Sequence, residues 1–109
     1  MKVLFLPEVR DYLKEVSLAM YEKDYFGFLE SAEKYIDELI YDIVTTLPFR
    51  QKKPAPEYFS KYGENLLYSI FPKNKNTSWY VFFNIFDDNG KTIYLVSYIS
   101  NNHVIAQFL

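Results

Sequence analysis

The chain has 109 residues, half of them hydrophobic and a fifth aromatic, which is enough to build one domain spanning residues 1–109. It contains no cysteine, which excludes a disulfide framework, thiolate catalysis and cysteine-ligated zinc. The net charge of −2 is unevenly distributed: residues 1–47 carry five basic and ten acidic side chains (−5), and residues 48–109 carry seven and four (+3). This segregation is compatible with one basic surface on an acidic protein.

The N-terminal segment begins with a short apolar run. Residues 2–6 predict a buried strand, and Pro7 is well suited to the first position of a following helix. Only four apolar residues directly precede Pro7, too few for the core of a signal peptide or for a membrane span. We therefore expect a soluble, cytoplasmic protein with no membrane partner.

Two helices are expected next. Apolar residues at helical spacing predict a first helix from Pro7 to near Asp24. The segment Tyr25–Phe28 contains the only glycine of the first half and is predicted to form the corner between the helices. A longer apolar stripe from Leu29 to Leu47, with acidic residues largely on other faces, predicts the second helix.

Residues 48–63 differ in character from the helices. They contain three prolines and the basic run Arg50-Gln51-Lys52-Lys53, and this proline density excludes a regular helix through their first part. The aromatic residues Tyr58, Phe59 and Tyr62 are predicted to anchor the segment as a connection that runs over the surface.

Three strands are predicted in the second half, over residues 65–71, 77–86 and 92–100. Asn89-Gly90 is typical of a two-residue hairpin turn between the last two. A regular register from this turn predicts the pairs Asp88–Lys91, Phe86–Ile93, Asn84–Leu95, Phe82–Ser97 and Tyr80–Ile99. The final apolar run, residues 104–109, fits either a short strand or a terminal turn.

The same register divides this hairpin into two faces. The almost wholly apolar face is predicted to pack on the helices; it holds Trp79, Val81, Phe83, Ile85, Tyr94, Val96 and Tyr98. The other face carries Tyr80, Asn84 and Ser97, which suits contact with solvent or a ligand. The expected fold is α+β, in the order β-α-α-β-β-β, with the N-terminal strand and helical hairpin packed on a twisted antiparallel sheet.

Several common kinds of site find no support in the sequence. The three glycines stand far apart, so there is no glycine-rich phosphate loop, and no serine lies in a nucleophile-elbow pattern. The single histidine and the solvated acidic residues of the second helix argue against a metal site. No cofactor is predicted.

The chain resembles the RelE/ParE superfamily of toxins from bacterial type II toxin–antitoxin systems, in a RelE-like subgroup, across essentially its whole length. The resemblance is carried by the element order and by four segments in this order and spacing: Tyr25–Phe28, Pro54–Gly63 with its Pro54-Ala55-Pro56 and Lys61-Tyr62-Gly63, Asn74–Phe83, and Tyr94–His103.

This resemblance implies a ribosome-dependent mRNA endonuclease that inhibits translation and is neutralised by a cognate antitoxin, in a complex that can be of higher order. Such ribonucleases let the ribose 2′-hydroxyl attack the adjacent phosphate, and they need a base, an acid and stabilising cations. The resemblance also implies that the site lies on the exposed face of the terminal sheet and its flanking basic loops, in contact with mRNA and ribosomal RNA.

On this basis His103 and Tyr80 are the candidate acid and base groups, since His103 is the only imidazole of the chain. The candidate substrate-binding residues are Arg50, Lys52, Lys53, Lys73, Lys75 and Ser97. No arginine follows Arg50, whereas ribonuclease members commonly carry one in the last strands; a lysine supplies charge but not the bidentate geometry of guanidinium.

Alternative interpretations remain open at this stage. His103 could be a turn residue beside Asn101-Asn102, the loop cations could serve solubility, and individual aromatic residues could belong to the core or to an antitoxin-covered patch. The protein could be a non-catalytic inhibitor of the same fold, such as a gyrase poison. It could also be a small protein-interaction module without nuclease activity.

Overall fold

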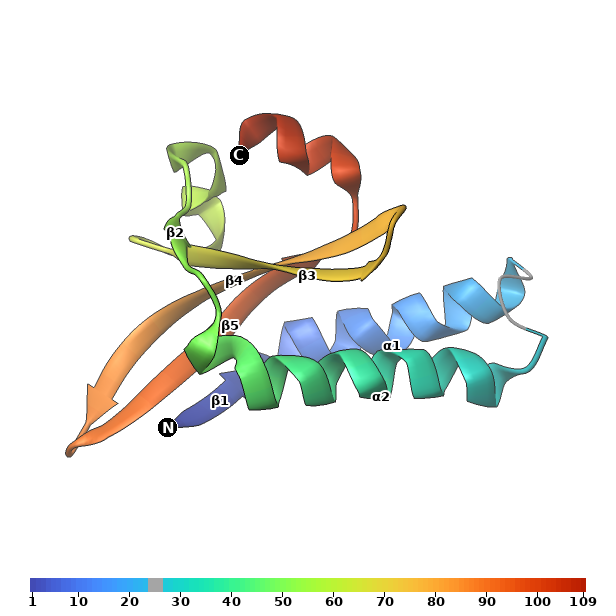
Figure 1. The fold of residues 1–109 in the computed structure, drawn as a ribbon, viewed down its shortest axis with the longest axis horizontal. Coiled ribbons are helices and arrows are strands. Elements are labelled where there is room, and N and C mark those ends of the chain that lie inside the picture. The colour runs from blue at the N-terminus through green and yellow to red at the C-terminus, as the bar shows by residue number, and fades with distance from the viewer. Residues whose placement is uncertain (24–26) are drawn as a thin grey trace.

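A five-stranded sheet separates two helices from two of the three 3-10 turns in the computed structural model, which describes residues 1–23 and 27–109 (Figure 1). In chain order the elements are β1 (Lys2–Phe5), α1 (Pro7–Glu22), α2 (Leu29–Thr46), the turn η1 (Leu47–Phe49), β2 (Lys53–Pro54), the turn η2 (Glu57–Tyr62), β3 (Leu67–Asn74), β4 (Thr77–Asp88), β5 (Lys91–Ser100) and the turn η3 (His103–Phe108). The α+β class expected from the sequence is confirmed.

The strands lie in the order β1-β5-β4-β3-β2. β1 pairs in parallel with β5, and every other pair is antiparallel, so the sheet is mixed and not wholly antiparallel as expected. The prediction of a buried first strand is wrong, because β1 is an edge strand in which Lys2 and Leu4 are exposed and Phe5 is buried. The two-residue β2 forms the other edge.

The helical hairpin forms largely as predicted. α1 begins at Pro7, whose missing N–H costs nothing at a helix start, and it ends at Glu22. α2 buries one stripe of its surface against the sheet and α1, and no described helix is long and apolar enough to cross a membrane. Of the predicted corner at Tyr25–Phe28, Tyr25 and Phe26 lie outside the described residues.

The main core fills the space between the helices and the sheet. Trp79, Val81 and Phe83 of β4 are fully buried there as predicted, whereas Ile85, predicted on the same face, is 41% exposed. The helices and the other strands contribute Val9, Leu13, Ile36, Leu39, Ile43, Leu47, Phe71, Tyr94, Val96 and Ile99. The Trp79 indole Nε1 donates a hydrogen bond of 3.1 Å to the Tyr35 hydroxyl of α2, which satisfies the one polar atom of this side chain.

A β-bulge interrupts the hairpin of β4 and β5. The predicted register is confirmed from Asp88–Lys91 through Asn84–Leu95, and Phe83 then pairs with Val96. The next pair is Phe82–Tyr98, so Ser97 is an extra residue with no partner across the ladder.

The bulge corrects two predicted pairs and two predicted faces. Phe82 faces Tyr98 instead of Ser97, and Tyr80 faces Ser100 instead of Ile99. One inserted residue moves every later side chain of β5 to the opposite face of the sheet from the one predicted. Ile99 therefore points to the helices, and Tyr98 packs on the other side.

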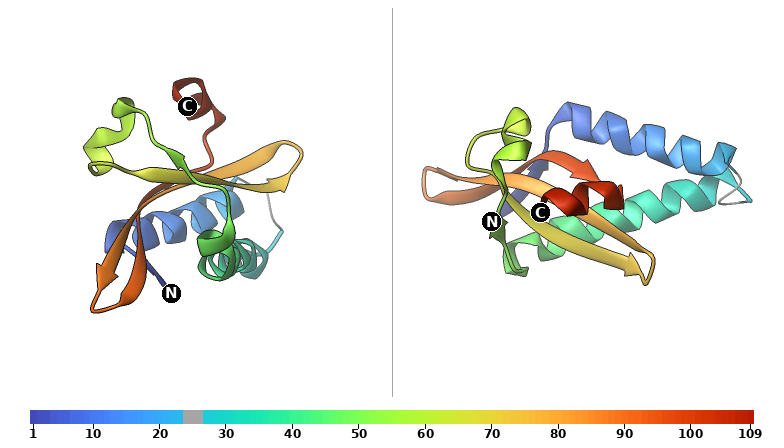
Figure 2. Two further views of the ribbon diagram at one scale, coloured as in Figure 1. Left: turned by 60° about the vertical axis from the view of Figure 1, so that its left-hand side comes forward. Right: turned by 90° about the horizontal axis from the view of Figure 1, so that it is seen from above.

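The face of the sheet opposite the helices is covered by η2 and η3, as two further views show (Figure 2). Phe82 lies at the centre of this second core and is fully buried, stacked on Phe59 of η2 with ring centroids 4.6 Å apart. Leu66, Tyr68 and Ile105 complete its buried part. Phe59 thus anchors the connection as expected, the terminal run is a 3-10 turn and not a strand, and this face is less open to a ligand than predicted.

Candidate functional site

Arg50, expected to contact phosphate, is held within the fold. Its Nη2 pairs with the Asp42 carboxylate of α2 at 3.2 Å, and its Nε donates to Thr46 Oγ1 at 3.0 Å. The guanidinium also lies 3.9 Å from the ring centroid of the buried Phe71. These contacts fasten the start of the basic connection to α2 and β3, and they occupy most of the donors that a phosphate would need.

Replacing Arg50 by lysine is therefore expected to affect stability and leave RNA binding unchanged. Lysine keeps the charge but loses the planar fork, and because both partners are about a third exposed the expected cost is only about 1 kcal/mol. Chemical denaturation measures the cost and fluorescence anisotropy with a single-stranded RNA measures binding. Weakened binding at unchanged stability would restore Arg50 to the list of RNA contacts.

Two further predicted cations are also engaged. Lys52 Nζ donates hydrogen bonds of 2.9 Å to the carbonyl oxygens of Pro48 and Arg50. Lys73 lies on β3 with its Nζ 5.2 Å from the ring centroid of Tyr35, on the side of the sheet that faces the helices. Both ammonium groups therefore support the fold.

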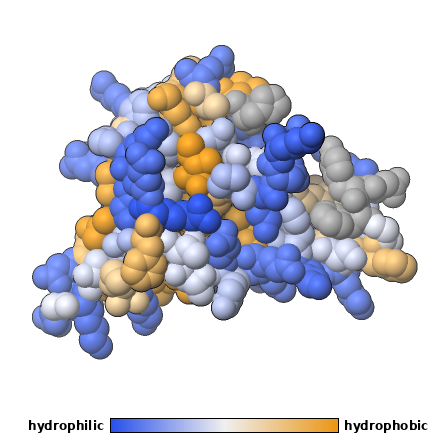
Figure 3. Space-filling view, in the orientation of Figure 1, coloured by the Kyte–Doolittle hydropathy of each residue, from blue (hydrophilic) through white to orange (hydrophobic). Residues whose placement is uncertain are grey.

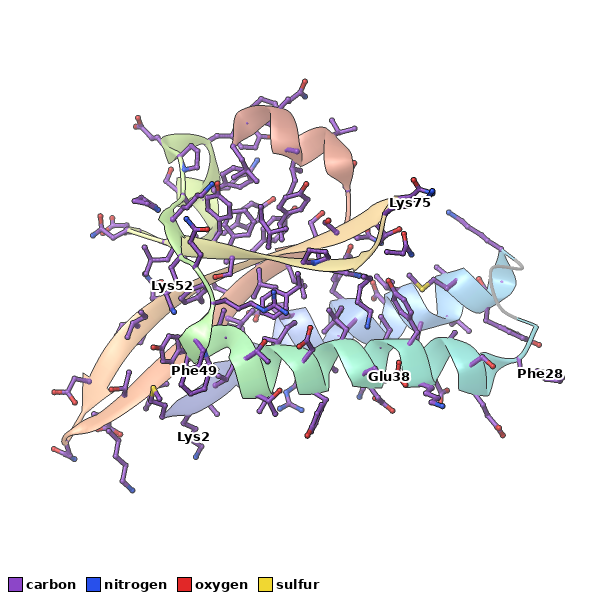
Figure 4. All side chains as sticks on the ribbon, in the orientation of Figure 1. Lys2, Phe28, Glu38, Phe49, Lys52 and Lys75 are labelled. Carbon is purple, nitrogen blue, oxygen red and sulfur yellow. The ribbon has the colours of Figure 1, made fainter. Side chains whose placement is uncertain are left out.

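The remaining predicted cations, Lys53 on β2 and Lys75 at the turn between β3 and β4, are exposed. Lys53 pairs with Tyr68 near the start of β3, and Lys75 follows the end of β3; Figure 4 labels Lys75 well apart from Lys52. Lys53 lines a shallow cavity of about 270 Å³ together with Arg50. The basic loops therefore do not converge on one phosphate-binding surface.

The two predicted acid and base candidates differ in how far the structure describes them. Tyr80 is half-buried and packs against the second core. His103 begins η3, and its side chain lies outside the described part of the structure.

Ser97, in contrast, opens onto a cavity of about 450 Å³ between the start of α1, η2 and β5. We call this cavity the tyrosine pocket; it is lined by Leu6, Glu8, Val9, Tyr12, Lys61, Tyr62, Ser97, Tyr98 and Ile99. Among the described residues, the Ser97 hydroxyl is a buried polar atom without a hydrogen-bond partner. Such an atom is costly to leave unsatisfied.

A row of aromatic rings leads to the tyrosine pocket from the surface. Phe108 of η3 stacks on Tyr58 with centroids 4.0 Å apart and planes 3° from parallel, and Tyr62 stacks on Tyr98 at 3.7 Å and 3°. Lys61 lies between the two stacks, its Nζ 4.4 Å from the ring centroid of Tyr58 and 5.4 Å from that of Tyr62. Figure 3 shows hydrophobic surface in the upper part of the visible face, where η2 and η3 lie, and a mainly hydrophilic surface along α2.

Two phenols of the pocket, those of Tyr98 and Tyr12, have a raised pKa. Burial raises the pKa of Tyr98 above its usual value; a hydrogen bond with Tyr62 adds to the rise, and a hydrogen bond with Ser100 and the charge of Lys61 oppose it. Burial also raises the pKa of Tyr12, with a smaller effect from Tyr98. Both hydroxyls therefore keep their protons at neutral pH and can donate a hydrogen bond to an anionic group.

The tyrosine pocket thus combines an ammonium group from Lys61, a carboxylate from Glu8 and protonated phenols. Of the residues predicted to form the site, it contains only Ser97; sequence reasoning missed Glu8, Tyr12, Lys61, Tyr62 and Tyr98. The Lys61-Tyr62-Gly63 motif was a usable signal for two of them. Tyr98 was assigned to the wrong face because the bulge at Ser97 has no local signature in the sequence.

In comparisons with known proteins, no protein-family model, curated protein or solved structure matches the chain.

Proposed function

We propose that this protein is a RelE/ParE-like toxin of a type II toxin–antitoxin system that cleaves mRNA at the ribosome, and that the tyrosine pocket is its reaction site. The observation that carries the proposal is the composition of this pocket. It brings a cation, a carboxylate and protonated phenols beside a serine hydroxyl without a partner. These are the groups that an attack of the ribose 2′-hydroxyl on phosphate requires.

Each group has a role in the proposed reaction. Glu8 accepts the proton of the 2′-hydroxyl, and the 2′-oxygen forms a bond to the adjacent phosphorus. Lys61 stabilises the charge that grows on the phosphate oxygens. The bond from phosphorus to the 5′-oxygen breaks, and the Tyr98 phenol protonates that oxygen. The products are a 2′,3′-cyclic phosphate and a 5′-hydroxyl end.

The aromatic row beside the pocket supports RNA as the substrate. Rings and a cation at the surface stack on unpaired bases without regard to sequence, and such stacking is worth about 1–3 kcal/mol per base. Tyr58 and Phe108 are both exposed and parallel, at the outer end of the row. A codon of mRNA held single-stranded on the ribosome presents such bases.

Expression without an antitoxin tests the proposal. Induction is expected to stop growth, and purified protein added to translating ribosomes is expected to cut the mRNA, with cyclic phosphate at the new 3′ ends found by primer extension and end labelling. Intact mRNA together with unimpaired growth would contradict the proposal.

A non-catalytic inhibitor is the second candidate, and the use of Arg50, Lys52 and Lys73 within the fold favours it. It predicts growth arrest with intact mRNA. DNA supercoiling by purified gyrase, measured with and without the protein, separates a gyrase poison from an interaction module.

A further inference from the structure

The surface of the helical hairpin contains a second large cavity, a groove of about 590 Å³ between α1 and α2. Its apolar part consists of Leu13, Leu18, Leu29, Ile36 and Ile40. Leu18 is 46% exposed and Leu29 is 36% exposed, although both are large aliphatic residues. The groove is therefore an apolar strip that the described residues of this chain leave partly uncovered.

The two rims of this groove carry opposite charges. Arg10 and Lys14 line it from α1, and Glu33 and Asp37 line it from α2. Among the described residues the only ion pair is that of Arg50 with Asp42, so no salt bridge crosses the groove. Arg10 lies over the Phe5 ring, 5.7 Å from its centroid, so Lys14 is the rim cation that a group of opposite sign can most readily pair with.

The charged residues of the two rims also lie at matching positions along the helix axes. Lys14 lies eight residues before the end of α1, and Asp37 lies eight residues after the start of α2. Since the helices run antiparallel side by side, both residues lie about 12 Å from the hairpin's connection (Figures 1 and 2). By the same count Arg10 is level with Tyr41, which is 71% exposed.

We propose that this groove is the interface of a homodimer in which two copies pack hairpin to hairpin around a two-fold axis parallel to the helices. That rotation places α1 of each copy against α2 of the other, and it leaves the position of each residue along the helix axis unchanged. Lys14 of one copy then faces Asp37 of the second, and Arg10 faces the ring of Tyr41, each contact occurring twice. The leucine and isoleucine side chains of the two grooves cover one another between these contacts.

The size of the face sets the expected strength. α1 is 16 residues long, so the face measures about 24 Å along the helices and about 20 Å across two helix diameters. Two copies therefore bury on the order of 1,000 Å², which is below the roughly 1,200–2,000 Å² of stable interfaces and in the range of weak, transient ones. A dimer with a dissociation constant in the micromolar range is expected.

A charge exchange tests the proposed geometry. Sedimentation velocity from about 1 to 200 µM is expected to show a monomer–dimer equilibrium, and Lys14→Glu or Asp37→Lys alone should weaken it about tenfold or more. The double variant Lys14→Glu/Asp37→Lys should regain wild-type association, since each new charge again faces its opposite in the second copy. Lys91→Glu and Asp88→Lys, at the turn between β4 and β5, make the same charge changes away from the hairpin and should leave association unchanged.

Three results would overturn the proposal: a monomer throughout the concentration range, single variants that associate like wild type, or a double variant that fails to recover. A monomer would leave the groove to a different protein. Thermal midpoints of all variants distinguish loss of association from loss of folding. The interface is independent of the tyrosine pocket, so failure of either proposal leaves the other standing.

Discussion

The variant Trp79→Ala is expected to lose about 3–5 kcal/mol of unfolding free energy, the largest stability effect of any single change considered. Trp79 is fully buried near the start of β4, on the side of the sheet that faces the helices. Its removal leaves a cavity that the surrounding helices and strands fill only in part. It also deprives the Tyr35 hydroxyl of the indole donor.

The size of this loss relative to the total makes it easy to measure. A domain of this length is stable by roughly 5–15 kcal/mol, so the variant should show a large fall in the midpoint of urea denaturation followed by circular dichroism. Ile70→Ala is a suitable control, because Ile70 lies on the neighbouring strand β3 but is 40% exposed and leaves no closed cavity. A loss below about 1 kcal/mol for Trp79→Ala would show that the main core is not centred on this residue.

The structure explains why the register of the β4–β5 hairpin could be predicted from the sequence up to Ser97 and not beyond it. The turn at Asn89-Gly90 is a local signal, and it fixes the register as far as Phe83 and Val96. Ser97 gives no comparable signal, since a small polar residue between apolar ones looks like ordinary alternation. One inserted residue then reverses the faces of Tyr98 and Ile99, and with them the composition of the site.

The contacts of Arg50 within the fold could not be predicted from the sequence for a different reason. A basic run among prolines is typical of an exposed loop, and nothing local indicates a partner. Asp42 lies on the preceding helix and Phe71 on a later strand, and only the folded chain brings them to one guanidinium. The second core is equally non-local, since it needs Phe59, Phe82 and Ile105 from three separate elements.

The variants Tyr98→Phe and Lys61→Ala are expected to reduce mRNA cleavage on translating ribosomes by about 100-fold or more each, the largest functional effects that the proposed mechanism predicts. Tyr98→Phe removes the proton donor but keeps the ring that stacks on Tyr62 at 3.7 Å. Lys61→Ala removes the cation from an exposed position of η2. Neither change opens a cavity in either core, so both proteins should stay folded.

Matched controls make the comparison specific to the tyrosine pocket. Tyr41→Phe and Lys91→Ala remove the same groups at exposed positions on α2 and at the start of β5, and they should cleave at the wild-type rate. Glu8→Gln provides a separate readout: if Glu8 is the base, this variant loses cleavage but still binds single-stranded RNA, because glutamine cannot accept the proton. Wild-type cleavage by folded Tyr98→Phe and Lys61→Ala would remove the pocket from the mechanism. Growth arrest that survives both changes while mRNA stays intact would instead identify a non-catalytic inhibitor, because binding alone does not need the proton of Tyr98.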